Sequence, residues 1–136
     1  MTTDVIDPSL HVSSFPATYT GPGTLIGHCV QSGGDETDVH GYFTSDGNAV
    51  QINIGFRPMR IRVFDETDVI LWDWMYGLAA THTIKQVTGG TTTVDTGSAI
   101  VPTEQAGVNN IAGNWIVTLS ATLCSTAKNI CFHIEG

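Results

Sequence analysis

Apolar and polar residues alternate one by one along many segments of this chain, and this period of two limits the possible folds more than any other feature. Successive side chains of an extended strand point to opposite faces, so each alternating segment buries one face and exposes the other. Short turn clusters separate the segments, at residues 21–23, 32–36, 45–48, 65–68, 88–90 and 96–98. Helix signals are weak and Thr, Val, Ile and Gly are frequent. The sequence therefore predicts an all-β protein with a β-sandwich or jelly-roll-like fold.

Strands are expected near residues 25–31, 39–44, 49–55, 59–64, 69–76, 81–87, 91–95, 114–124 and 130–135. Residues 103–113 fit either a loop or one short helical turn. Residues 1–24 contain several prolines and no alternating run, which predicts an extended N-terminal arm, and residues 25–136 are expected to form a single β-sandwich domain. Removing residues 1–20 is expected to leave a folded domain and to weaken its attachment to a partner.

Residues 59–74 give the most informative hairpin pattern, with the loop placed at residues 65–68. The expected pairs are Phe64–Val69, Val63–Ile70, Arg62–Leu71, Ile61–Trp72, Arg60–Asp73 and Met59–Trp74. One face then holds only apolar side chains, namely Met59, Ile61, Val63, Ile70, Trp72 and Trp74. A shift of one residue would bury an arginine, so the alternation is expected to set the register.

Three aromatic residues share one parity of the second strand in this hairpin: Trp72, Trp74 and Tyr76. Such a set is typical either of a sugar-stacking platform or of a hydrophobic core. The expected register places Trp72 and Trp74 opposite apolar residues, which favours the core. Tyr76, at the end of the strand, is expected to be the exposed member.

The C-terminal residues show a second alternating pair of segments, 114–124 and 130–135, which predicts another hairpin. Matching their apolar faces puts Leu123 opposite Phe132, Ala121 opposite Ile134 and Cys124 opposite Cys131 on the outer face. Two cysteines so placed can be bridged only at a non-hydrogen-bonded pair. The first residues have neither the basic nor the apolar region of a secretory signal, so we expect all three cysteines, including Cys29, to be reduced.

Charge and hydropathy exclude several classes of function. The chain carries 5 Lys and Arg residues against 13 Asp and Glu residues, a formal net charge of −8. Such an acidic surface repels phosphate backbones, so no nucleic-acid partner is expected. No apolar stretch approaches the length that crosses a bilayer, so no membrane partner is expected either.

A search for catalytic chemistry finds no nucleophile elbow, phosphate-binding loop, zinc-protease motif or dinucleotide fingerprint. The five histidines are scattered, and the cysteines lack the spacing of a zinc site. Acidic residues cluster at 35–38 and 65–68, where turn formation explains them better than cation binding does. The sequence thus predicts no catalytic, metal or cofactor site, and a protein that is not an enzyme.

The run GFRPMRIRVFDETDVILWDWMYGL at 55–78, the Thr/Gly-rich segment at 81–101 and the strand at 114–123 resemble small structural proteins of tailed bacteriophages. They are similar to the head decoration, or cement, proteins of these viruses; residues 25–48 have no counterpart in the pattern. The resemblance implies a β-sandwich or jelly roll that is made in the host cytoplasm and assembles as a homotrimer on the capsid exterior. It also implies an N-terminal arm or loop that contacts the major capsid protein.

The function expected from this resemblance is stabilisation of the phage head by a virion structural protein. Two alternatives remain: a tail, baseplate or fibre component, and a carbohydrate-binding module that uses Tyr76 and Trp115. The candidate partner-binding residues are Phe15, Tyr19, Arg57 and Tyr76.

Overall fold

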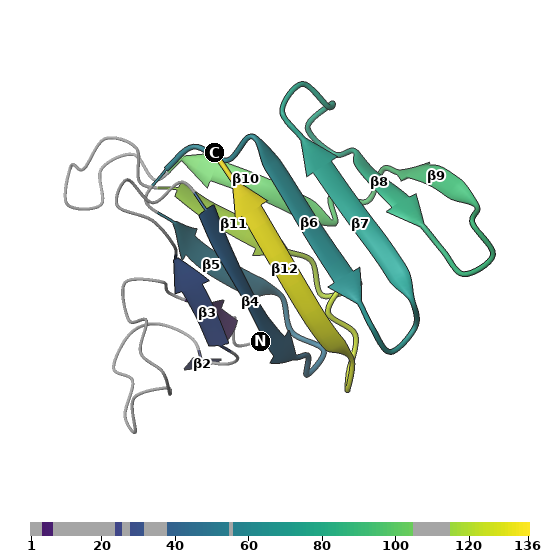
Figure 1. Ribbon diagram of the computed structural model, residues 1–136, viewed down its shortest axis with the longest axis horizontal. Coiled ribbons are helices and arrows are strands. Elements are labelled where there is room, and N and C mark those ends of the chain that lie inside the picture. The colour runs from purple at the N-terminus through teal and green to yellow at the C-terminus, as the bar shows by residue number, and fades with distance from the viewer. Residues whose placement is uncertain (1–3, 7–23, 26–27, 32–37, 55, 105–114) are drawn as a thin grey trace.

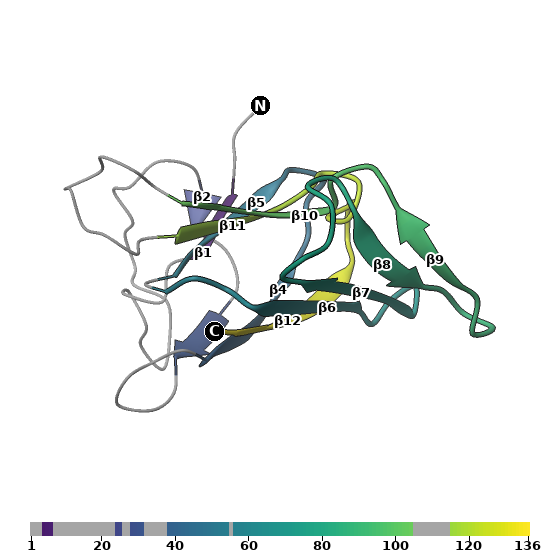
Figure 2. The same ribbon diagram turned by 90° about the horizontal axis from the view of Figure 1, so that it is seen from above.

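The computed structural model describes residues 4–6, 24–25, 28–31, 38–54, 56–104 and 115–136. These ranges contain strands and turns and no helix. The strands form two sheets that face each other as the two layers of a β-sandwich (Figure 1; Figure 2). The predicted all-β sandwich is confirmed.

The larger sheet has seven strands in the order β3-β4-β12-β6-β7-β8-β9. Their bounds are β3 His28–Gln31, β4 Asp38–Thr44, β12 Asn129–Glu135, β6 Arg60–Asp65, β7 Ile70–Met75, β8 Thr83–Gln86 and β9 Thr92–Asp95. All neighbouring strands in it are antiparallel. The β8–β9 hairpin extends past the smaller sheet (Figure 2), which explains why β9 is almost fully exposed.

The smaller sheet has five strands in the order β10-β11-β5-β1-β2. Their bounds are β10 Ile100–Glu104, β11 Trp115–Leu119, β5 Val50–Ile54, β1 Asp4–Ile6 and β2 Thr24–Leu25. Strand β1 runs parallel to both β5 and β2, whereas β11 is antiparallel to both of its neighbours, β5 and β10.

The core lies between the sheets and is formed by the inward side chains of both. It consists of Val39, Phe43, Val50, Ile52, Ile54, Ile61, Val63, Trp72, Trp74, Ala99, Ile100, Val117, Leu119, Leu123, Cys124, Ile130, Phe132 and Ile134. Trp72 is 4% exposed and Trp74 is 8% exposed, so the prediction that they are core residues is confirmed.

The β6–β7 hairpin has the predicted faces but a different register. Ile61 pairs with Trp74, and Val63 pairs with Trp72, a shift of two residues from the expected pairs. The turn is correspondingly formed by residues 66–69, and Val69 takes a φ of 56°. Because the side-chain period is two, this shift keeps every inward residue of the paired strands inward. Met59, however, was expected in the core and is 45% exposed, because it precedes the first residue of β6.

The predicted C-terminal hairpin is wrong. Strand β11 ends at Leu119 and belongs to the smaller sheet, whereas β12 lies in the larger sheet between β4 and β6. The chain turns after β11 in a loop where the Cys124 N–H donates to the Ser120 carbonyl at 2.9 Å. Cys124 is therefore buried and Cys131 exposed, and neither forms a disulfide. The alternation in β11 and in β12 reflects the burial of one face of each strand against the opposite sheet. It does not indicate that the two strands pair with each other.

Two further differences concern the smaller sheet. Residues 4–6 pair with β5 as a strand, so this part of the predicted arm is integrated in the sheet; residues 1–3 and 7–23 lie outside the described ranges. Strand β10 was not predicted, and its residues 103–104 fall where a loop or helical turn was expected. Pro102 interrupts the β-strand signal there, and its position on an edge strand is the one that proline tolerates.

Candidate partner-binding surfaces

Arg57, Tyr76 and Trp115 come together at one end of the sandwich, and we call them the Arg57 cluster. The Arg57 Cζ lies 4.5 Å from the centroid of the Tyr76 ring and 5.8 Å from that of the Trp115 ring. Both distances fall within the range of cation–π attraction. Arg57 and Tyr76 are exposed and Trp115 is half-buried, so the cluster is anchored on one side and open to solvent on the other.

Separate elements position the three side chains. Arg57 follows β5, and the next residue, Pro58, is buried. Tyr76 directly follows β7, and its N–H donates to the Met59 carbonyl at 2.9 Å, which holds the chain beside the start of β6. Trp115 opens β11 and packs against the core. The rings are thus fixed by the framework of both sheets.

The sequence had singled out Arg57 and Tyr76 as partner-binding residues, and Tyr76 with Trp115 as a sugar platform. The structure brings all three together. No sequence signal predicted this convergence, because the residues are far apart in the chain and meet only through the stacking of the two sheets. Phe15 and Tyr19, the other two candidates, lie outside the described residues.

A second surface lies on the outer face of the larger sheet. Tyr42, Cys131, Phe64 and Leu71 are directly paired across β4, β12, β6 and β7, and we call them the apolar row. Tyr42 is 59% exposed and Phe64 is 38% exposed. The row therefore presents two aromatic side chains to solvent, with the exposed Cys131 between them and the partly buried Leu71 beside Phe64.

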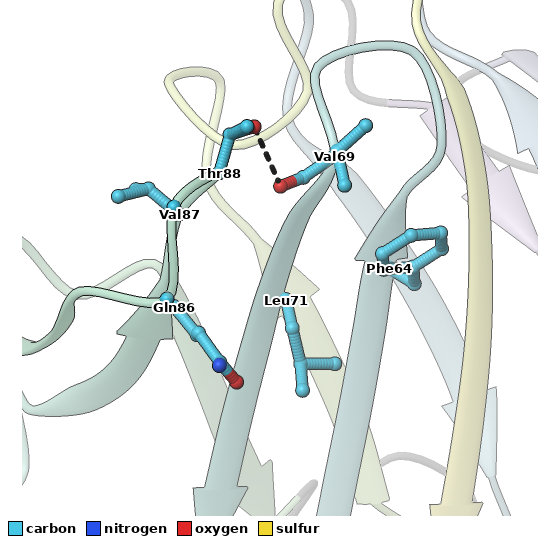
Figure 3. Close-up of a pocket in the computed structure, with 8 residues that line it drawn as sticks. Phe64, Val69, Leu71, Gln86, Val87 and Thr88 are labelled. Atoms are coloured by element: carbon cyan, nitrogen blue, oxygen red, sulfur yellow. Dashed lines mark hydrogen bonds between the residues drawn. The ribbon is translucent and has the colours of Figure 1, made fainter.

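Two hollows lie along the apolar row, one beside Phe64 and Leu71 and the other beside Tyr42 and Cys131. One has a volume of about 360 Å³ and is lined by Phe64, Val69, Leu71, Gln86, Val87, Thr88, Gly89 and Gly90 (Figure 3). The Thr88 hydroxyl lies 3.5 Å from the Val69 carbonyl oxygen and 3.2 Å from that of Asp68, which ties the β8–β9 turn to the β6–β7 turn. The other has about 320 Å³ and is lined by Tyr42, Phe43, Thr44, Glu66, Asn129, Ile130 and Cys131. The surface is thus contoured rather than flat.

Polar and charged side chains on the same face contact one another beside the apolar row. His133 Nε2 lies 2.5 Å from Asp38 Oδ1, and its Nδ1 lies 3.5 Å from Glu135 Oε1. Arg60 contacts Asp73 with an N–O distance of 2.9 Å. The hydrogen bond to Asp73 raises the pKa of the Arg60 guanidinium above its ordinary value, against the opposing effect of desolvation.

The acidic turn at 65–68 has a structural role. The buried Asp65 carboxylate accepts a hydrogen bond from the Asp68 N–H at 3.0 Å, and Asp68 pairs with Lys128 at 2.9 Å. The interpretation as turn chemistry is confirmed for this cluster; residues 35–37 lie outside the described ranges. Among the described residues, no three His, Cys, Asp or Glu side chains are grouped so that they could hold a metal ion.

The part of the chain that the structure describes also contains no helix long and apolar enough to cross a membrane.

The fold and these two surfaces define an all-β sandwich protein with exposed apolar side chains on its larger sheet and an arginine–aromatic cluster at one end. Comparison of the chain with known protein families, with curated proteins and with solved structures found no match.

Proposed function

We propose that this chain is a structural protein of a tailed-bacteriophage virion, a head decoration protein that binds the capsid exterior and stabilises the head. The apolar row carries the proposal. Isolated exposed apolar residues are normal on monomeric proteins, but a contiguous group flanked by polar residues marks an interaction site. Tyr42 and Phe64 form such a group with Cys131 and Leu71, beside the polar side chains of His133 and Asp38, which contact each other.

The proposed partner is the major capsid protein, with the decoration protein acting as a homotrimer. Apolar contact area of this kind contributes about 25 cal/mol for each Å² removed from water. Each copy needs only a modest affinity for the capsid. Once one subunit of the trimer is bound, the other two are held close to the capsid surface at a high effective concentration. The many copies on one particle then add their contributions against internal pressure.

The test is co-sedimentation of the purified protein with phage capsids that lack their decoration protein. We expect the wild-type chain to be depleted from solution and Phe64→Ser to bind about tenfold more weakly, as expected for loss of a central apolar contact. Val94→Ser is the matched control, since Val94 is 57% exposed but lies on the edge strand β9. Binding to isolated tails but not to heads would instead favour a tail or baseplate component.

A carbohydrate-binding module is the second candidate, and the meeting of Tyr76 and Trp115 favours it. Tryptophan fluorescence during titration with glycans tests it directly. A saturable change that is lost in Tyr76→Ala, with the fold intact, would replace the structural proposal.

A further inference from the structure

Arg57 differs from most of the basic residues in this chain because no carboxylate in the described ranges neutralises it. The chain has 5 Lys and Arg residues. Arg60 and Arg62 lie within 4.0 Å of Asp73, and Lys128 lies 2.9 Å from Asp68. The remaining cation, Lys85, lies 4.7 Å from the centroid of the largely buried Trp72 ring. Arg57 is therefore an exposed positive charge that, among the described residues, is paired with aromatic rings and with no carboxylate.

Both rings lie close to the central carbon of the Arg57 guanidinium. The Arg57 Cζ lies over the face of the Tyr76 ring and over the face of the Trp115 ring. A guanidinium carries five N–H donors, all in its own plane, and a cation–π contact does not use a hydrogen-bond donor. Their best partner is a planar oxyanion with two oxygens, which accepts two parallel hydrogen bonds.

We propose that Arg57 is the anchor of a carboxylate-binding site, and that its ligand is an Asp or Glu side chain of a protein partner. Tyr76 and Trp115 hold the guanidinium in place and lower the entropy that it loses when it binds. Arg, Tyr and Trp are also the residues that contribute most at protein–protein contacts. This inference does not require the partner to be a capsid.

An acidic sugar is the other source of the same carboxylate chemistry, and the geometry disfavours it. The guanidinium lies 4.5 Å from the Tyr76 centroid and 5.8 Å from the Trp115 centroid. Arg57 lies over both rings, so a sugar that stacks on those same ring faces has to displace Arg57. The site therefore suits a small carboxylate that approaches the edge of the guanidinium.

The experiment is an NMR titration of the full chain that follows the Arg57 Nε–H and Trp115 Nε1–H signals. The probe is N-acetylglutamic acid amide, and its neutral counterpart N-acetylglutamine amide is the ligand control. Glucuronate, glucose and inorganic phosphate form the other arms. Arg57→Gln removes the charge and the guanidinium donors. Arg62→Gln is the matched control, because Arg62 is also an exposed arginine but lies 4.0 Å from the Asp73 carboxylate and outside the Arg57 cluster.

We expect saturable shifts with the glutamate probe and none with the glutamine probe. Arg57→Gln should abolish them, Arg57→Lys should weaken binding at least about fivefold through loss of the two-point contact, and Arg62→Gln should leave binding unchanged. Equal or tighter binding of phosphate would overturn the carboxylate assignment, and shifts with glucose as well as glucuronate would show a sugar platform. The absence of any saturable shift would overturn the site. None of these outcomes depends on capsid binding.

Discussion

Arg60 reaches diagonally across the β6–β7 hairpin to Asp73, at 2.9 Å, although the residue directly opposite Asp73 is Arg62. The Arg62 Nε atom lies 4.0 Å from the same carboxylate. One half-buried Asp73 thus serves two arginines, and the shorter contact is the diagonal one. Diagonal neighbours in a sheet lie within reach of a long side chain, which explains the geometry.

Replacing these arginines one at a time should separate their contributions. Arg60→Gln is expected to lower thermal stability slightly, and Arg62→Gln less, because Arg62 makes the longer contact. Added salt should reduce the difference between the two variants, since exposed ion pairs are screened. Thermal unfolding at low and high salt measures the stability of both variants. A larger loss of stability for Arg62→Gln than for Arg60→Gln would contradict the diagonal pairing.

Trp72→Ala is expected to lower the free energy of unfolding by about 3–5 kcal/mol, the cost of a large cavity in a core. Trp72 is 4% exposed. Met59→Ala is the control and should change stability by no more than about 0.5 kcal/mol, because Met59 is 45% exposed. Denaturant unfolding gives both values. A near-neutral Trp72→Ala would mean that this residue does not support the core.

The two cysteines on either side of the last turn should differ in reactivity. Cys131 is exposed and Cys124 is fully buried, so a thiol reagent should label Cys131 in the native protein and Cys124 only after unfolding. Mass spectrometry of the labelled protein, with Cys29→Ser as background, identifies the sites. Equal labelling rates in the native state would argue that Cys124 faces solvent.

Removing residues 1–6 should destabilise the smaller sheet, in contrast to the expectation from the sequence. Strand β1 pairs with β5 over Asp4–Val50, Val5–Gln51 and Ile6–Ile52. Its loss removes backbone hydrogen bonds, and we expect the free energy of unfolding to fall by about 1–3 kcal/mol. It also leaves an unpaired edge on β5, so we expect the truncated protein to aggregate more readily. Deletion of residues 1–3 retains β1 and is the matched control. Equal stability of the two truncations would support a detached arm.

The inward faces of most strands could be predicted from the sequence. Ile61 and Val63, Trp72 and Trp74, and Ile130, Phe132 and Ile134 are buried as their alternation predicts. The partners of the strands could not be predicted in the same way. The apolar face of β11 matches that of β12 as well as it matches any other strand, and the structure places the two strands in different sheets.

The candidate surfaces show the same division. Tyr76 could be predicted as exposed from its place at a strand end, but its contact with Arg57 and Trp115 depends on how the sheets stack. The apolar row depends on the order of β4, β12, β6 and β7, and no local pattern encodes that order.

Alternation along the chain is enough to predict that it forms strands and which side of most strands is buried, because side-chain direction in a strand is a local property with a period of two. The tertiary structure alone decided which strands are neighbours, the two-residue shift in the β6–β7 register, and the meeting of Arg57 with its two rings. Each of these choices leaves the alternation of every strand unchanged. Only packing between segments that are distant in the chain distinguishes among them.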